Sequence, residues 1–187
     1  MYRAADLRKG LKIELDGEPH LVVTFEFTKP GKGQAMYRCR LRNMITGNQF
    51  DRTYRSGDSF KPASLESRVM TYLFNDGQFY TFMDQKTYEQ YQISAAQLGD
   101  VAKLLTDNLE VEVLVFDDKP IDVSLPNFVT LVVAQADPAA RGDTATGVTK
   151  LAVMETGYEL YVPGFIEEGD KIQIDTRTGE YATRSKE

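Results

Sequence analysis

The sequence predicts an all-β protein made of three small barrels. Short runs of alternating apolar and polar residues recur along the chain, turn dipeptides separate them, and little of the chain has a helical period. The 187 residues are 42% hydrophobic and 27% charged, as in a folded chain long enough for one to three small domains. We expect domains over 1–64, 65–126 and 127–187, joined by short linkers.

The first of these domains is expected to be an SH3-like barrel. Asp16-Gly17 is a strong signal for a hairpin turn between two strands. In the second of these strands, a strict period of two would place on one face the residues Leu21, Val23, Phe25 and Phe27. Two more strands, AMYRCRLRN and NQFDRTYR, flank the turn MITG. Four strands joined in this way predict a small barrel.

The second and third domains are each expected to be OB-fold barrels of five short strands. In the second, aromatic strands flank Asn75-Asp76-Gly77, and two further strands flank Asp117-Asp118. One short helix is expected between these strand pairs, centred on Val101 to Thr106, because Gly99 interrupts the longer segment. The third begins with NFVTLVVAQA and continues with strands near 151–154, 159–162 and 171–175, closing at Tyr181.

The composition excludes several classes of site. His20 is the only histidine and Cys39 the only cysteine, so catalytic triads, histidine-pair or cysteine-rich metal sites and an intrachain disulfide are not expected. No apolar run approaches the roughly 18–20 residues needed to cross a bilayer, and residues 1–10 lack a signal-peptide core. We therefore expect a cytoplasmic protein that is not an enzyme, with no cofactor and no membrane partner.

The charge is divided unevenly along the chain. Residues 1–64 hold 12 Lys and Arg against 7 Asp and Glu, a net charge of +5, whereas residues 65–187 carry −11. A basic first third followed by an acidic remainder suggests that one end of the protein meets phosphate groups. The alternative is that this division is a random unevenness between domains.

The segment MYRCRLRN places its arginines on one face of a strand. Tyr37, Cys39 and Leu41 alternate with Arg38, Arg40 and Arg42, so Cys39 is expected to be a core residue. Successive arginines on a strand lie about 6.6 Å apart, a spacing suited to phosphates along a nucleic acid, and Arg52 and Arg55 would add to the patch. A solvated face balanced by neighbouring carboxylates is the alternative.

The segment TKPGKGQA predicts a hairpin loop with one cation at its tip. Pro30 fixes φ, while Gly31 and Gly33 would allow positive φ and close approach to a narrow crevice. Lys32 is then the functional group at the tip, with Gln34 beside it. The spacing is not that of a Walker loop or a dinucleotide fingerprint. Taken alone, the local sequence favours the alternative, a mobile hairpin tip whose lysine aids solubility.

Longer motifs reveal a resemblance to one family. KPGKGQA followed by RLRNMITGNQFDRTYRSGD resembles bacterial translation elongation factor P, in which the first domain is KOW-type. TYLFNDGQFYTFMDQKTYEQ resembles the second domain of that family, and PNFVTLVV, RGDTATG and IDTRTGEYATR resemble the third. The resemblance therefore extends over nearly the whole chain.

The resemblance implies an L-shaped, tRNA-like monomer that binds the 70S ribosome, with its rRNA and ribosomal proteins, between the P and E sites. Lys32 would point towards the CCA end of the P-site peptidyl-tRNA and relieve stalling at consecutive prolines. In the family, a modifying enzyme commonly extends this lysine, often with a β-lysyl group. The resemblance also assigns RNA contacts to the loop residues Arg141, Gly142, Asp143 and Thr144, and to Tyr181 and Arg184. Tyr181 is equally consistent with a core residue.

The chain departs from the family pattern in the third domain, at Ala139, Leu151, Val153 and Gly164. A second class of function remains open on the residues alone, a general single-stranded RNA-binding protein built on OB barrels. That class requires exposed aromatic side chains on which bases stack.

Overall fold

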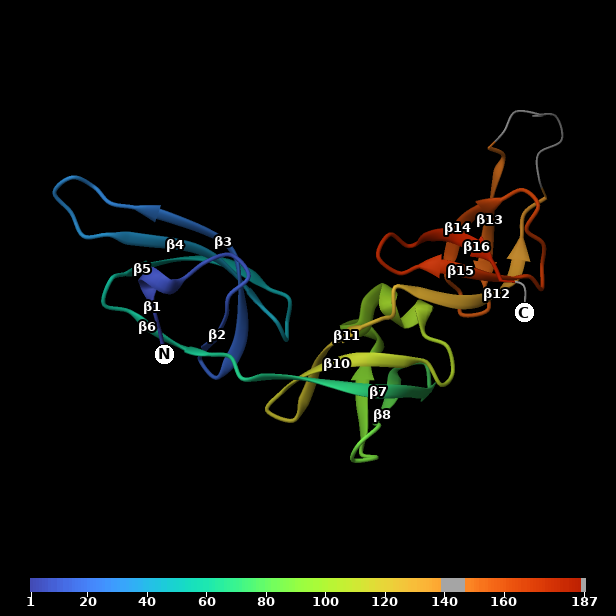
Figure 1. The fold of residues 1–187 in the computed structure, drawn as a ribbon, viewed down its shortest axis with the longest axis horizontal. Coiled ribbons are helices and arrows are strands. Elements are labelled where there is room, and N and C mark those ends of the chain that lie inside the picture. The colour runs from blue at the N-terminus through green and yellow to red at the C-terminus, as the bar shows by residue number, and fades with distance from the viewer. Residues whose placement is uncertain (139–146, 186–187) are drawn as a thin grey trace. The chain divides into compact units, whose positions relative to one another are not determined.

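The computed structural model describes residues 1–138 and 147–185. The chain separates into two compact units, residues 1–67 with 114–122 and residues 68–113 with 123–187, and each is described by itself. Three β-sheets contain nearly all of the regular structure, and each lies inside one of the three predicted domains (Figure 1). The all-β, three-barrel prediction is confirmed; the domain boundaries stay a prediction.

The first sheet has six strands in the order β1-β6-β2-β3-β4-β5. Their bounds are β1 Tyr2–Arg3, β2 Lys12–Leu15, β3 Glu18–Thr28, β4 Met36–Asn43, β5 Gln49–Arg55 and β6 Ser59–Pro62, with a 3-10 turn at Ala4–Asp6. The Asp16-Gly17 hairpin is confirmed, since both residues have positive φ, 53° and 80°. The short strands β1 and β6, which pair with one another, were not expected from the sequence.

A β-bulge corrects the predicted face of β3. The pairing of β3 with β4 shifts between Val22 and Thr24, so that Val23 is the extra residue. Before the bulge Val22 points into the core and is fully buried; after it Phe25 faces the core side. The prediction that Leu21, Val23, Phe25 and Phe27 share one face is therefore wrong, because one inserted residue reverses the phase of a period-two pattern.

The second sheet has the strand order β11-β10-β7-β8-β9. Its strands are β7 Leu65–Asn75, β8 Phe79–Asp84, β9 Gln90–Ser94, β10 Glu110–Phe116 and β11 Lys119–Ser124. The predicted helix is two short pieces, α1 Ala95–Leu98 and a 3-10 segment, η2, at Gly99–Leu104. Ser94 caps α1 by accepting a hydrogen bond from the Gln97 N–H at 3.2 Å. The break at Gly99, where φ is 60°, was predicted; the position of the α-helical turn before it was not.

The third sheet has the corresponding order, β14-β13-β12-β15-β16, with the first strand of the barrel at its centre. Its strands are β12 Phe128–Ala136, β13 Thr149–Met154, β14 Glu159–Pro163, β15 Lys171–Asp175 and β16 Glu180–Arg184. The buried core beneath it includes Leu104 of η2. The Thr156 hydroxyl also donates to the Lys103 carbonyl oxygen. These contacts tie η2 to the third barrel within the second unit.

Candidate functional site

The loop between β3 and β4 ends in a tight turn. The Gly33 N–H donates to the Pro30 carbonyl oxygen at 3.2 Å, which places Gly31 and Lys32 at the two central positions of the turn. This loop forms the free end of the β3–β4 hairpin (Figure 1). Neither Gly31 nor Gly33 has a positive φ, so the expectation that the reversal uses the left-handed region is wrong.

The two glycines of the turn differ in their surroundings. A Cβ atom added at Gly33 would lie 3.2 Å from the Pro30 Cγ, whereas one added at Gly31 would meet nothing within 4 Å. Gly33 therefore allows the turn to close over the proline ring. Nothing in the hairpin itself requires glycine at position 31, so the missing side chain there leaves room for an external partner.

Lys32 lies exposed at the centre of this turn. Among the described residues, no hydrogen-bond acceptor or carboxylate partners its ammonium group. Every residue from Thr28 to Gln34 is also exposed, so the side chain is free to extend away from the barrel. A flexible ammonium with three donors suits a target with several oxygen acceptors.

The arginine face of β4, defined by Arg38, Arg40 and Arg42, has the predicted geometry. Burial alternates strictly along the strand, with the partner residues Tyr37, Cys39 and Leu41 buried in the first barrel. Burial raises the pKa of the Cys39 thiol, as expected of a core residue and not of a reactive nucleophile.

One of the three arginines is bound by a carboxylate. Asp51 is the register partner of Arg40 on β5, and its two carboxylate oxygens accept hydrogen bonds from Nε at 2.9 Å and Nη2 at 3.3 Å. The hydrogen bond and charge of Arg40 lower the pKa of Asp51, and Asp51 in turn raises the pKa of Arg40. Both side chains are about half exposed, 52% and 43%, so the pair is open to exchange with an external anion.

Arg38 and Arg42 are the cations of this face that no carboxylate binds directly, although the charge of Arg38 also helps to lower the pKa of Asp51. Neither forms an ion pair within the part of the chain that the structure describes. They are separated by four residues along the strand, or about 13 Å. The free charges are thus spaced more widely than the row of three that the sequence suggested.

The structure places Arg52 and Arg55 on opposite faces of β5. Arg55 pairs in register with Met36 on the arginine face, whereas Arg52 pairs with buried Cys39. The guanidinium carbon of Arg52 lies 5.4 Å from the centroid of the Phe50 ring, a cation–π contact. The expectation that both residues extend the basic patch is correct for Arg55 and wrong for Arg52.

The candidate RNA-binding residues of the third barrel are less accessible to a partner than those of the first barrel. Tyr181 is partly buried and packs against the core of this barrel, which favours the core alternative. The Nη2 atom of Arg184 donates to the Asp170 Oδ1 at 2.6 Å. The predicted contacts at Arg141, Gly142, Asp143 and Thr144 lie outside the described residues, as does Ala139.

The only histidine is structural. His20 is buried, its Nδ1 lies 3.0 Å from the Glu18 carbonyl oxygen, and its ring packs edge-on against Phe50. Over residues 1–138 and 147–185, no group of three or more His, Cys, Asp or Glu side chains is arranged to hold a metal ion. None of the described helices is long and apolar enough to cross a membrane.

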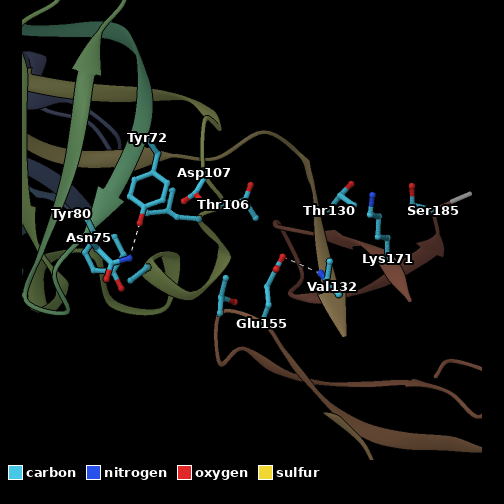
Figure 2. Close-up of a pocket in the computed structure, with 13 residues that line it drawn as sticks. Tyr72, Asn75, Tyr80, Thr106, Asp107, Thr130, Val132, Glu155, Lys171 and Ser185 are labelled. Atoms are coloured by element: carbon cyan, nitrogen blue, oxygen red, sulfur yellow. Dashed lines mark hydrogen bonds between the residues drawn. The ribbon is translucent and has the colours of Figure 1, made fainter. Parts of the chain in front are cut away.

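A cleft of about 850 Å³ in the second unit was not foreseen from the sequence. Tyr72, Asn75 and Tyr80 line it together with Glu155 and Lys171, and Figure 2 shows these side chains around the opening. The Asn75 side-chain amide donates to the Tyr72 hydroxyl at 2.7 Å. Its lining combines residues more than 90 positions apart, so no local pattern could have indicated it.

Comparison with solved structures identifies the class of fold. The fold, tandem β-barrels, is shared with the solved "Eukaryotic translation initiation factor 5A from Methanococcus jannaschii", at a TM-score of 0.55 and 21% identity over 64% of this chain and 88% of that one. A "Translation initiation factor eif-5a family protein from Naegleria fowleri ATCC 30863" matches 66% of this chain and 96% of its own, with a TM-score of 0.51 and 14% identity. These two likenesses establish the fold alone.

Sequence comparison identifies the family. Family models match as the "Elongation factor P (EF-P) KOW-like domain" over residues 3–60, the "Elongation factor P (EF-P) OB domain" over 65–123 and "Elongation factor P, C-terminal" over 129–184. Elongation factor P of Syntrophus aciditrophicus is 58% identical, and elongation factor P 2 of Geobacter sulfurreducens 59% identical, each over all of both chains. The chain belongs to the elongation factor P family, and it is therefore a translation elongation factor.

Proposed function

We propose that this factor binds the ribosome between the peptidyl-tRNA site and the exit site and stimulates peptide-bond formation at consecutive prolines. The observation that carries this proposal is the position of Lys32. Its ammonium is exposed at the centre of a glycine-flanked turn at the end of a hairpin, without a partner among the described residues. In the bound state, Lys32 would contact the CCA end of the peptidyl-tRNA.

The action of Lys32 is positioning and not bond-making. Proline reacts slowly because its ring restricts the geometry of approach and a polyproline chain is stiff. Two or three charge-assisted hydrogen bonds, each about 1.5–3 kcal/mol, would hold the CCA end in place. If they act only in the productive geometry, they increase the rate by about 10²- to 10³-fold. The ribosome then supplies the chemistry, and the factor needs no catalytic group or cofactor.

The arginine face is the proposed contact with RNA. Arg38, Arg42 and Arg55 are exposed on one side of the β4–β5 pair, and their fork-shaped guanidinium groups suit phosphate oxygens of tRNA or rRNA. Arg40 would join them when phosphate displaces Asp51. Contacts through Tyr181, Arg184 and residues 141–144 remain secondary proposals, because Arg184 would first have to leave Asp170.

We further propose that a dedicated enzyme extends Lys32, for example with a β-lysyl group. The open space at Gly31 supports this, since an enzyme must surround the lysine to modify it. The intact mass of the native protein, compared with protein made in a host without the modifying enzyme, measures the extension directly. The proposed setting is cytoplasmic, with the factor acting as a monomer.

The decisive experiment is Lys32→Ala with Lys29→Ala as the matched control. Lys29 is an exposed lysine of the same loop that lies outside the Pro30–Gly33 turn. We expect Lys32→Ala to fold normally and to bind ribosomes within a few-fold of wild type, yet to lose about 10²-fold in the rate of Pro-Pro-Pro synthesis. Lys29→Ala should keep that activity, and a reporter without prolines should respond to neither change.

Full activity of the Lys32→Ala protein in the Pro-Pro-Pro assay would reject the proposal. Equal binding of ribosomes and free single-stranded RNA would instead favour a general RNA-binding function. A ribosome affinity that does not depend on salt would argue against the phosphate contacts, since these release counterions.

A further inference from the structure

The third barrel exposes an apolar surface on the outer side of β13 and β14. Leu151 and Tyr161 are register partners, and Val153 lies two residues further along on the same side, opposite Glu159. Their neighbours Ala152 and Leu160 point inward and are buried. Tyr161 is 69% exposed, and Phe165, just after the strand, is 63% exposed. We call Leu151, Val153 and Tyr161 the outer face of the third barrel.

This outer face does not serve the fold of its own barrel. Leu151 and Val153 are only partly buried, and neither they nor Tyr161 belong to the buried core, which is made by inward residues such as Met154 and Val162. Large apolar side chains gathered on an exposed sheet surface characterise sites of interaction. A tyrosine at the centre of such a surface is typical of a binding hot spot, because it buries a large area with few rotatable bonds.

The charges around the outer face indicate the kind of partner. The two strands, both fully described, contain two charged residues, Lys150 and Glu159. Lys150 pairs in register with buried Val162 and therefore lies on the inward side, so Glu159 is the one charged residue on the outward side. RNA binding requires cations that neutralise phosphates, and the outward side of β13 and β14 offers the carboxylate of Glu159 instead. The charge is complementary to a basic protein.

We propose that the outer face of the third barrel docks a basic protein of the ribosome, with Tyr161 as the apolar anchor and Glu159 paired to an Arg or Lys of that protein. That the partner belongs to the ribosome rests on the proposed function. Proteins that lie among rRNA phosphates carry an excess of Lys and Arg, so their exposed surfaces can supply a cation to pair with Glu159. The outer face is thus distinct in chemistry from the arginine face of the first barrel.

Substitution of Tyr161 tests the anchor, with Tyr88 as the matched control. Tyr88 is an exposed tyrosine of similar exposure, 71%, in the second barrel. We expect Tyr161→Ser to weaken binding to purified 70S ribosomes about 10-fold without lowering the thermal stability, because a buried aromatic anchor is lost only in the complex. Tyr88→Ser should bind as wild type does. Equal affinities for wild type and Tyr161→Ser would overturn the inference.

Charge reversal at Glu159 distinguishes a protein partner from RNA. Glu159→Lys should weaken 70S binding if the partner is basic, and strengthen it if the partner is RNA. A photo-cross-linking amino acid in place of Tyr161 should give an adduct that survives RNase and is lost on proteolysis. Tighter binding of Glu159→Lys, an rRNA adduct, or a dimer of the free factor through this surface would overturn the inference. If wild type fails to bind 70S at all, the proposed function fails instead.

Discussion

The arginines of the first and third barrels differ in whether a carboxylate of the same barrel already binds them. In the first barrel one of the three arginines of β4 is paired, Arg40 with Asp51. In the third barrel Arg177 is bound by Asp175 at 2.8 Å and Arg184 by Asp170 at 2.6 Å. The first barrel, with an excess of basic residues, thus leaves Arg38 and Arg42 without an ion pair, whereas Arg177 and Arg184 in the described part of the more acidic third barrel are each bound by a carboxylate. We therefore expect the number of unpaired guanidinium groups, and not the number of arginines, to decide the proposed contact with RNA.

The largest effect on ribosome binding is expected when the unpaired arginines of the first barrel are removed. Replacing both Arg38 and Arg42 by Gln should weaken ribosome binding about 10-fold at moderate salt and reduce the slope of log affinity against log salt by about two, one for each lost phosphate contact. The same double replacement at Arg177 and Arg184 should change the affinity less than about twofold. Titrations at several salt concentrations measure both quantities.

An equal loss in the two double variants would show that pairing within the barrel does not decide which arginines meet RNA. The thermal stability of both variants should be checked in the same buffers. Arg177 also lies over the Phe128 ring, with 5.5 Å between its guanidinium carbon and the ring centroid, so its replacement removes packing as well as charge.

A smaller effect in the opposite direction is expected from Asp51→Asn. The asparagine keeps an acceptor for Arg40 but removes the negative charge that competes with phosphate. We expect ribosome affinity to increase a few-fold and the salt slope to increase by about one, because a third guanidinium becomes available. Unchanged binding would mean that phosphate already displaces Asp51 in the wild-type complex, or that Arg40 does not face RNA.

The smallest effect concerns the free protein in acid. Since the pKa of Asp51 is lowered in the folded state by Arg40, the pair stabilises the fold above the ordinary aspartate pKa of about 4, and this contribution is lost as the pH falls through the lowered value. Asp51→Asn should therefore lower the melting temperature slightly at pH 7. The difference from wild type should vanish in strong acid, as measured by thermal melts across the pH range. A difference that persists in acid would point to a packing effect.

Part of the candidate site could be predicted from local sequence. The exposed arginines and buried Cys39 of β4 follow from period-two alternation, which is a property of the strand itself. The turn at Asp16-Gly17 follows from the need for positive φ at both positions. The loop around Lys32 was also correctly placed between two strands, although its glycines do not use the left-handed region.

The remaining features depend on which strands become neighbours. The bulge at Val23 is visible only in the pairing with β4, and it reverses the face of every residue that follows. The register of β5 against β4 likewise decides that Arg52 lies on the core side of the sheet and that Asp51 pairs with Arg40. No pattern within one strand encodes these relations.

The sequence by itself determined the all-β class, the position of a lone lysine between two glycines, and the excess of basic charge in the first 64 residues, because alternation, turn chemistry and net charge are local or additive properties. Only the tertiary structure decided which arginines are free, and that Leu151, Val153 and Tyr161 form one surface. Ion pairs and patches arise from residues that pairing of the strands brings within a few ångströms. That pairing is set by the packing of the whole barrel.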